Sequence, residues 1–561
     1  MRQSRVARLL HTVRHLRAGQ LLWQLRYRLL PRAGAPDAPK ELKLRNLALR
    51  PCVAPRESGA GGEFRFLNAS SRFDDEPDWA AAEMPKLWRY NLHYFDYALA
   101  PDRSQQEVHA LIDSWIRANP AGTADAWEPY PASLRIVNWI KYFRLRHGAL
   151  DVPAHRRSSL WQQAAWLARN LERHILANHY LKNVKALVFA GAYFDEAAAK
   201  RWLKDGTRVF AEQVAEQFLA DGGHYERSPM YHAICTEDLL DVLNLAQQAP
   251  SLFPEEFCTG LRVRCISALR WLEAMCMPDG AITLFNDSAF GIAPTLRELH
   301  EYAARLGVDA AAPDAAGAQA GARAISLEAS GYYILGSGGD KLVIDCGAIG
   351  PDYQPGHTHC DTLSYELALN GRRVIVDTGV HDYEASPHRR YARGTAAHNT
   401  VMVDGEEQSE MWGAFRVARR ARPLHAGAVS GPGPGARFEG AHDGYRRLAG
   451  GVLHKRMIEH DGYRAWRVQD TLEGRGQHTA ESFLHLHPTY RAVLRDATVV
   501  VTDAAGGTVV TIEPDGTDDV RVDCGWYFPE FGQALRNDVI ILVSNGELPR
   551  RFGYRITKTV D

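Results

Sequence analysis

The chain has 561 residues, of which 45% are hydrophobic and 24% charged, and its formal net charge is −1. This length exceeds what one hydrophobic core usually supports, so we expect two or three domains. The nearly neutral charge gives no indication of nucleic-acid binding, and the sequence has no apolar run of about 20 residues that would predict a transmembrane helix. Eight cysteines without C-x-x-C pairs favour buried thiols in a reducing compartment over a disulfide framework.

Residues 1–79 are predicted to form a basic N-terminal helical segment followed by an extended lead-in. The first 32 residues contain eight arginines and no acidic residue, with leucines between them. The arginines interrupt every apolar run that could serve as a secretion signal, which needs about 7–15 apolar residues, so we expect a cytoplasmic protein. A basic amphipathic helix can lie on an anionic membrane surface. Packing on the next domain, with solvated arginines, is the alternative, and the sequence leaves both open.

Residues 80–306 are predicted to form a helical domain. Apolar residues recur at intervals of three and four in segments such as 159–179, 200–221 and 260–277. Short turn segments separate them, which suits an array of helical hairpins. The Ala- and Gly-rich segment 307–324 is expected to be a linker.

Residues 325–561 are predicted to form an all-β domain. Short alternating or β-branched runs such as KLVIDCG, RRVIVDTG and DVIILVSNG end in glycines. Many such runs in sequence favour a sandwich of antiparallel sheets.

Chemically rich stretches occur in the helical part. LANHYLKN places Asn178 and His179 at the end of the helix predicted for 159–179, where a frayed terminal turn is the alternative. DGGHYERSPMYH contains Glu226 and Tyr231 in a loop that enters a helix, with Pro229 suited to its first turn.

Another stretch, AWEPYPASLRIVNW, contains Trp127, Tyr130 and Arg135. Aromatic faces beside polar groups suit sugar rings, although core packing is an equal alternative. LFNDSAF (284–290) could line a cleft or form a turn.

The segment 356–399 is the richest in the β part. It contains an H-x-H-x-D cluster at His357, His359 and Asp361, then Asp377 in a D-T-G, then His398 in an H-N. Neutral imidazoles and carboxylates close together suit a zinc site or a proton-transfer site. Hydrogen bonds that merely hold the sheet edge are the alternative.

Together the motifs N-H in LANHYLKN, D-G-x-x-x-E-x-S-P-x-Y-H, GHTHCD, VDTG and AAHNTV resemble those of the heparinase II/III-like polysaccharide lyases. The resemblance covers roughly residues 80–420 in matching order. It implies an incomplete (α/α) toroid followed by an antiparallel β-sandwich. It also implies β-elimination of a uronic-acid-containing polysaccharide, which needs neutralisation of the substrate carboxylate, a proton acceptor near C5 and a donor near the glycosidic oxygen.

The resemblance also implies residue roles. Asn178 would neutralise the carboxylate with help from His179, Tyr231 would donate a proton to the leaving oxygen, and His357 would act as base or second neutralising group. Candidate substrate contacts are Trp127, Tyr130, Arg135, Glu226, Tyr391 and Arg393, with Tyr391 preferred to the neighbouring Tyr383. A structural zinc ion would be held by His359, Asp377 and His398, with Asp361 orienting a ligand.

Two alternatives to a lyase remain at this point. One is a non-catalytic glycan-binding or biosynthesis-assisting protein, and the other is a zinc-dependent glycan hydrolase. We expect the partner to be an acidic polysaccharide or oligosaccharide, such as a bacterial exopolysaccharide, capsule or O-antigen glycan, with no organic cofactor. Membrane contact, if present, is expected through residues 1–32.

Overall fold

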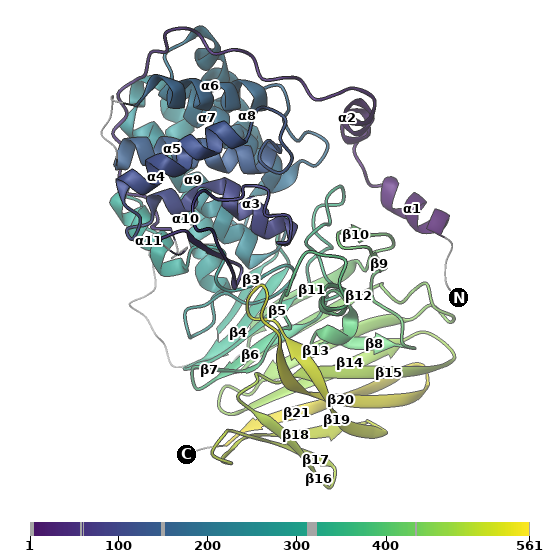
Figure 1. Cartoon of the computed structure of the whole chain (residues 1–561). Helices are drawn as coiled ribbons and strands as arrows, with labels where there is room; N and C mark the ends of the chain where they lie inside the picture. Colours follow the sequence, from purple (N-terminus) through teal and green to yellow (C-terminus); the bar gives the residue numbers. More distant parts are fainter. Residues whose placement is uncertain are drawn as a thin grey trace.

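The computed structural model describes residues 5–55, 59, 61–146, 152–310, 323–431 and 435–559, and it places a helical part before a β part (Figure 1). This order is the one that the change of periodicity near residue 325 predicts. Most of the expected linker 307–324 lies outside the described residues.

The helices of the first part form an incomplete (α/α) toroid. They are α3 (Lys86–Tyr94), α4 (Gln105–Ala118), α5 (Pro129–Leu145), α6 (Ala154–Leu167), α7 (Ala177–Tyr193), α8 (Ala197–Gln217), α9 (Pro229–Gln248), α10 (Glu255–Met275) and α11 (Leu296–Arg305). The 3-10 turns η1 (Asp96–Leu99) and η2 (Pro250–Leu252) lie between them, and the hairpin β1 (Glu63–Phe66) and β2 (Ala69–Arg72) precedes them.

The first turns of α9 and α7 carry Tyr231 and the pair Asn178 and His179, respectively. Ser228 caps α9, because its hydroxyl accepts a hydrogen bond from Tyr231 N at 3.1 Å, and Pro229 fits the first turn as predicted. At the start of α7, the capping residue Leu176 and the first helical residue Ala177 have φ of +66° and +53°, which is uncommon for residues other than glycine.

The predicted helix over 159–179 is wrong at its end. Helix α6 ends at Leu167, and Asn178 and His179 lie in the first turn of α7. The apolar pattern continues through the irregular segment 168–176, so periodicity does not reveal the break.

The β part is a sandwich of antiparallel sheets, as predicted. The eight-stranded sheet contains β11 (Pro423–Ser430), β12 (Ala436–His442), β13 (Leu453–His460), β14 (Ala465–Glu473), β21 (Arg550–Lys558), β18 (Thr508–Asp515), β17 (Thr498–Thr502) and β16 (Arg491–Arg495) in that spatial order. The four-stranded sheet contains β19 (Asp519–Tyr527), β20 (Leu535–Glu547), β15 (Gln477–His485) and β8 (Val401–Val403). The five-stranded sheet contains β3 (Arg323–Leu327), β4 (Tyr332–Ser337), β5 (Asp340–Asp345), β6 (Tyr365–Leu369) and β7 (Arg372–Ile375).

One hydrophobic core joins the three sheets. It contains Leu342 of β5, Trp466 of β14 and Leu542 of β20, all of them buried. Outside the sheets, the chain forms the short pair β9 (Met411–Trp412) and β10 (Arg416–Val417), helix α12 (Pro387–Ala392) and the turn η3 (Thr395–Ala397).

A second apolar cluster fixes the two parts to each other. Trp271 and Met275 of α10 pack against Tyr332 and Ile334 of β4. The Trp271 indole N–H also donates to Ser330 Oγ at 2.9 Å. This contact between α10 and β4 holds the two parts together, and the first turn of α9 lies close to the segment that begins at His357.

The N-terminal helices α1 (Arg5–Val13) and α2 (Ala18–Leu29) lie to one side of the molecule, away from the other helices (Figure 1). Helix α2 contacts both parts, since Tyr27 donates to Leu171 O at 2.6 Å and Gln20 donates to Tyr353 O at 3.3 Å. Among the described residues, no helix combines the length and apolar character that a bilayer-spanning segment requires.

A buried ion pair in the sandwich supports the histidine-rich segment. Arg456 and Asp470 are both buried, and the guanidinium donates to the carboxylate at 2.8 and 2.9 Å. Arg456 also donates to the main-chain oxygens of Leu363, which lies just before β6, and of Asn399, which directly follows His398. Burial would raise the pKa of Asp470, but Arg456 and His454 lower it to about 2.

Replacing Arg456 with alanine is therefore expected to reduce the free energy of unfolding by about 3–5 kcal/mol, because it leaves a buried carboxylate without its partner. Urea denaturation followed by tryptophan fluorescence measures this loss. The control is Arg437→Ala on the exposed Arg437–Glu439 pair, which should cost less than about 1 kcal/mol. Equal effects of the two substitutions would contradict a structural role for the buried pair.

Candidate functional site

A cavity of about 630 Å³ lies between the toroid and the β part. Four residues that the sequence singles out line it, namely Tyr130 of α5, His179 of α7, Tyr231 of α9 and His357 of the β part. Residues from distant segments thus meet at one cavity.

Asn178 is held at the edge of this group by a buried carboxylate. Its amide nitrogen donates to both oxygens of Glu226, at 3.0 and 2.9 Å, and its main-chain N–H donates to Glu226 Oε1 at 2.9 Å. Both side chains are buried, and Asn178 Oδ1 has no partner among the described residues. The positive φ angles of Leu176 and Ala177 accompany this placement, and strain of this kind is frequent at functional sites.

His179 lines the cavity and is held by a carboxylate. Its Nδ1 lies 3.2 Å from Glu172 Oε1, and its ring packs against Tyr130 with centroids 4.4 Å apart. Burial would lower the pKa of His179, but the Glu172 carboxylate outweighs it and raises the pKa above the usual value.

Tyr231 lies between two groups of the β part. Its hydroxyl is 3.0 Å from the Tyr383 hydroxyl, and its ring stacks on His357 with centroids 3.9 Å apart. Burial, together with the neighbouring Tyr383, raises the pKa of Tyr231 well above its usual value. The phenol is therefore protonated in the free protein.

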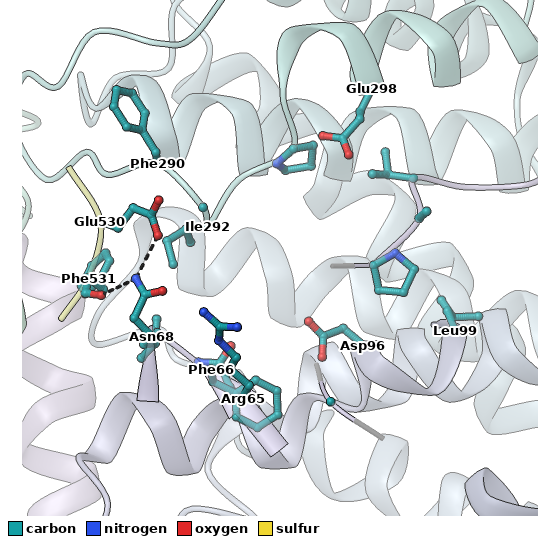
Figure 2. A pocket seen from close by; sticks show the side chains of 18 of the residues that line it. Arg65, Phe66, Asn68, Asp96, Leu99, Phe290, Ile292, Glu298, Glu530 and Phe531 are labelled. Carbon is teal, nitrogen blue, oxygen red and sulfur yellow. Dashed lines mark hydrogen bonds between the residues drawn. The ribbon is translucent and has the colours of Figure 1, made fainter. Parts of the chain in front are cut away.

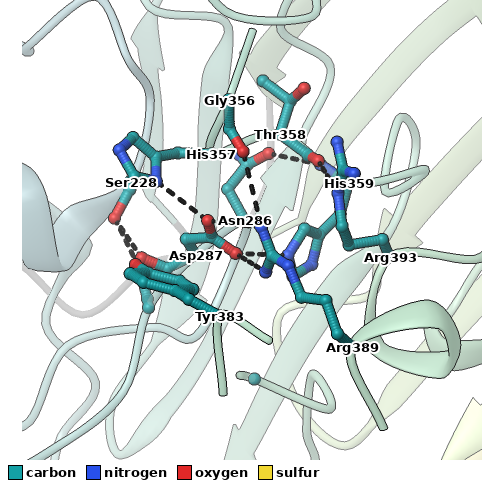
Figure 3. A network of polar contacts seen from close by, with 12 residues as sticks. Ser228, Asn286, Asp287, Gly356, His357, Thr358, His359, Tyr383, Arg389 and Arg393 are labelled. Carbon is teal, nitrogen blue, oxygen red and sulfur yellow. Dashed lines mark hydrogen bonds and ion pairs between the residues drawn. The ribbon is translucent and has the colours of Figure 1, made fainter. Parts of the chain in front are cut away.

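Asp287 connects the histidines of the β part (Figure 3). Its carboxylate lies 2.8 Å from His357 Nδ1 and 2.8 Å from His359 Nε2, and it pairs with both terminal nitrogens of Arg389. Burial would raise the pKa of Asp287, but Arg389 and the two histidine hydrogen bonds hold it well below its usual range. Since Asp287 accepts at Nδ1 of His357, Nε2 is the nitrogen left to accept a proton.

A buried group of metal-ligand type lies behind Asp287. Ligand atoms of His359, Asp361 and His398 all lie within 4.8 Å of one another. His359 Nδ1 and His398 Nε2 have no hydrogen-bond partner among the described residues, so both nitrogens are left for a metal ion. Asp377 lies 2.8 Å from His398 Nδ1, on the far side of that ring. The structure thus places Asp361, rather than the predicted Asp377, with the two histidines.

Several residues expected at the substrate lie elsewhere. Trp127 is buried and donates to Asn119 O, and Arg135 is buried against Trp115 with its guanidinium carbon 3.9 Å from the ring centroid. Glu226 holds Asn178 and does not line the cavity. Aromatic and charged residues near a helix start can serve the core equally well, which explains these errors.

In the β part, Tyr391 accepts from Trp526 N at 3.3 Å and Arg393 donates to Thr358 O at 3.2 Å, and neither lines the cavity. Tyr130 is the predicted substrate contact that does line it. The preference for Tyr391 over Tyr383 is therefore wrong, since Tyr383 lines the cavity and bonds to Tyr231.

Two groups that organise His357 were not predicted from the sequence. Asp287 lies in LFNDSAF, for which the sequence allowed either a cleft lining or a turn. Arg389 lies in α12. An acidic residue inside an otherwise apolar segment is the signal that could have identified Asp287.

The chain is similar in sequence and in fold to known proteins. Residues 66–306 match the family described as "Heparinase II/III N-terminus", and residues 319–555 match "Heparinase II/III-like, C-terminal". The crystal structure of heparinase III superposes with a TM-score of 0.69 at 18% identity, covering 87% of this chain and 80% of that one.

Among curated proteins, the heparin-sulfate lyase of Pedobacter heparinus is 24% identical over 361 residues, 59% of this chain and 53% of that protein. The heparin-sulfate lyase of Bacteroides thetaiotaomicron is 22% identical over 391 residues, 63% of this chain and 55% of that protein. The chain thus spans about half the length of the curated relatives it matches. Because the two family matches together cover most of its length, the chain belongs to the heparinase II/III-like family.

Proposed function

We propose that the protein is a polysaccharide lyase that cleaves a uronic-acid-containing glycan by β-elimination. The observation that supports this most directly is the convergence of His179, Tyr231 and His357 from both parts of the molecule at one cavity, with Asn178 next to His179 in the first turn of α7. The heparin-sulfate lyase activity named for the relatives is consistent with it.

In this proposal, the substrate carboxylate binds between Asn178 and His179. The His179 imidazole, when protonated, stabilises the negative charge that develops when the C5 proton leaves, and the Asn178 amide, which Glu226 holds in the free protein, lies beside it. Glu226 and Glu172 hold these two side chains in place. They act as positioning residues, because each contacts the neutralising group and not the cavity centre.

His357 is the proposed base. Nδ1 is held by Asp287, so Nε2 takes the C5 proton and the electron pair moves into the carboxylate. The electron pair then returns to form the C4=C5 double bond as the C4–O4 bond breaks, and Tyr231 donates its phenolic proton to the leaving O4. The raised pKa of Tyr231 supports this assignment, since a phenol must remain protonated in order to donate.

The alternatives receive less support. A zinc-dependent hydrolase needs its metal at the substrate, but His359, Asp361 and His398 are buried and do not line the cavity. A purely glycan-binding protein has no need for a histidine–aspartate pair beside a buried phenol.

Tyr231→Phe is expected to lower the turnover of a uronate glycan by about 100- to 10,000-fold, because the leaving oxygen loses its proton donor. Ultraviolet absorbance of the unsaturated product measures turnover. The control, Tyr225→Phe, removes another buried hydroxyl that bonds to Tyr353, and it should retain most activity. Full turnover by Tyr231→Phe would refute the assigned role.

We further propose that His359, Asp361 and His398 hold a structural zinc ion. His359 Nδ1 and His398 Nε2, which have no hydrogen-bond partner in the described part of the chain, lie beside the Asp361 carboxyl and support this. Burial raises the pKa of Asp361 to about 6, so a nearby cation would stabilise its ionised form. When bound, the ion would neutralise charge and fix the strands that present His357. Asp377 would orient His398 through Nδ1.

His398→Ala is expected to reduce zinc content from about one equivalent to nearly none and to lower the melting temperature, because it removes one ligand of a tetrahedral site. Elemental analysis and calorimetry measure the two effects. The control is His381→Ala in the more exposed His381–Asp382–His388 group, which should leave the zinc content unchanged. Loss of zinc from the control alone would place the ion in that second group.

We also propose that α1 and α2 attach the protein to an anionic membrane surface, where a glycan such as an exopolysaccharide, capsule or O-antigen intermediate would be processed. Leu22, Leu25 and Leu29 of α2 are exposed by 66%, 53% and 70% on one face. Val6 and Leu10 of α1 are exposed by 65% and 66%. Arginines flank these residues, so apolar insertion and attraction to anionic headgroups would act together.

The triple substitution Leu22→Ser, Leu25→Ser and Leu29→Ser is expected to weaken binding to phosphatidylglycerol-containing vesicles by more than about tenfold, since each leucine contributes on the order of 1 kcal/mol or more. Vesicle co-sedimentation measures it. Leu424→Ser with Val429→Ser, on the exposed face of β11, is the control. Wild-type binding to neutral vesicles alone would contradict the electrostatic part, and dimer formation without vesicle binding would contradict the proposal.

A further inference from the structure

A pocket of about 580 Å³ lies between the end of α1 and the β part, and it shares no lining residue with the cavity that contains Tyr231. Trp412 of β9 donates to Thr12 Oγ1 at 3.1 Å, which holds α1 against the β part (Figure 1). Among the described residues, six arginines, two histidines and one acidic residue line this pocket, namely Arg14, Arg419, Arg420, Arg422, Arg446, Arg447, His11, His15 and Asp443. Three separate segments therefore bring basic side chains to one place.

The carboxylates nearby do not balance these arginines. Three arginines have an acidic partner: Arg420 lies 2.9 Å from Asp352, Arg419 lies 3.3 Å from Glu410 and Arg447 lies 3.9 Å from Glu406. Arg14, Arg422 and Arg446 are exposed and have no ion pair within the described ranges of the chain. Asp443 is the remaining carboxylate, and it accepts from Arg422 N at 2.8 Å. Six guanidinium groups thus face four carboxylates, which leaves two positive charges without a counterpart.

Arg420 is the buried arginine of the pocket. Its side chain is 4% exposed, and its Nε has no hydrogen-bond partner among the described residues. His11 Nδ1 is a second buried nitrogen of the pocket without such a partner. Burial lowers the pKa of Arg420, Asp352 opposes this effect, and the charges of Arg14 and Arg422 lower the pKa further. Since a buried charged donor without a partner is unfavourable, an anion beside Arg420 would stabilise this arrangement.

The cavity in Figure 2 differs from this pocket in its charge. Its volume is about 570 Å³, and Arg65 shares the lining with the carboxylates of Asp96, Glu298 and Glu530. An anion bound there would meet groups of its own sign. Positive charge prevails in the pocket beside α1 and not in that cavity.

The position of the pocket favours a lipid headgroup as the source of the anion. Val6 and Leu10 of α1 are exposed, and Arg14 follows them at the same spacing of four residues. Arg14 N donates to Leu10 O at 3.1 Å, so the helical turn continues to Arg14. The exposed apolar face of α1 therefore leads directly to an arginine of the pocket. A bilayer that takes up these apolar side chains would present its headgroups to Arg14.

We infer that this pocket binds a phosphate group that carries about two negative charges, as a phosphate monoester or a diphosphate does. Such a charge matches the two unbalanced positive charges of the pocket, whereas a phosphodiester supplies only one. Arginine suits this ligand because its guanidinium forms paired hydrogen bonds to phosphate oxygens. The phosphate site stands on the pocket itself. The lipid source rests on the proposed membrane attachment through α1 and α2.

Inorganic pyrophosphate is the soluble probe for this site. Calorimetry on the full-length protein should detect its binding. Combining Arg14→Gln, Arg422→Gln and Arg446→Gln should weaken that binding at least about tenfold, because hydrogen bonds between charged groups contribute on that scale. These side chains are exposed, so the variant is expected to fold.

The matched control combines Arg208→Gln, Arg297→Gln and Arg437→Gln, which removes the same charge from partly exposed side chains outside the pocket. It should bind pyrophosphate as the wild type does. No pyrophosphate binding, or an equal loss in both triple variants, would overturn the inference. Unchanged pyrophosphate binding together with weaker binding of a uronate polymer in the pocket variant would also overturn it and assign the pocket to the glycan.

Vesicles distinguish a lipid source from a soluble one. Phosphatidylcholine vesicles containing phosphatidic acid or phosphatidylglycerol, matched in total charge, present a monoester or a diester. In co-sedimentation, the wild type should bind the phosphatidic acid vesicles about tenfold more tightly, and the pocket variant should lose this preference. Pyrophosphate binding without the preference would assign the site to a soluble phosphate compound. Pyrophosphate binding without binding to any vesicle would refute the proposed membrane attachment, while the phosphate site would stand.

Discussion

The carboxylate of Asp287 is the constraint on which the site depends. One buried group accepts from His357, from His359 and from Arg389, so it links the proposed base, the metal-type cluster and helix α12. An isolated buried carboxylate would be very unfavourable, and the arginine compensates for it. The toroid supplies Asp287 while the β part supplies its three partners. The interface between the two parts is therefore stabilised by these charged hydrogen bonds as well as by apolar packing.

Much of the fold could be predicted because its signals are periodic. The helical and β parts, the loop before α9 and Pro229 in its first turn follow from local patterns. The end of the helix predicted for 159–179 could not be found, because apolar spacing continues where the backbone becomes irregular.

The candidate site was predictable where several unusual residues share one motif. Tyr231, His357 and Asn178 meet as the motifs suggest, although their roles remain proposals. Trp127 and Arg135 were misplaced, because an aromatic or a cation near a helix start has the same sequence signature in a core as in a cleft. Asp287 and Arg389 were missed, because a long-range ion pair between the two parts leaves no local pattern.

The placement of α2 has a consequence for motion. The helix is hydrogen-bonded to Leu171 in the toroid and to Tyr353 in the β part, and Arg17 just before it pairs with Glu216 of α8. Any hinge movement that separates Leu171 from Tyr353 has to break one of these attachments. The amphipathic helix α2 thus braces the toroid and the β part against each other. A surface that binds its leucines would also limit how far the two parts can separate.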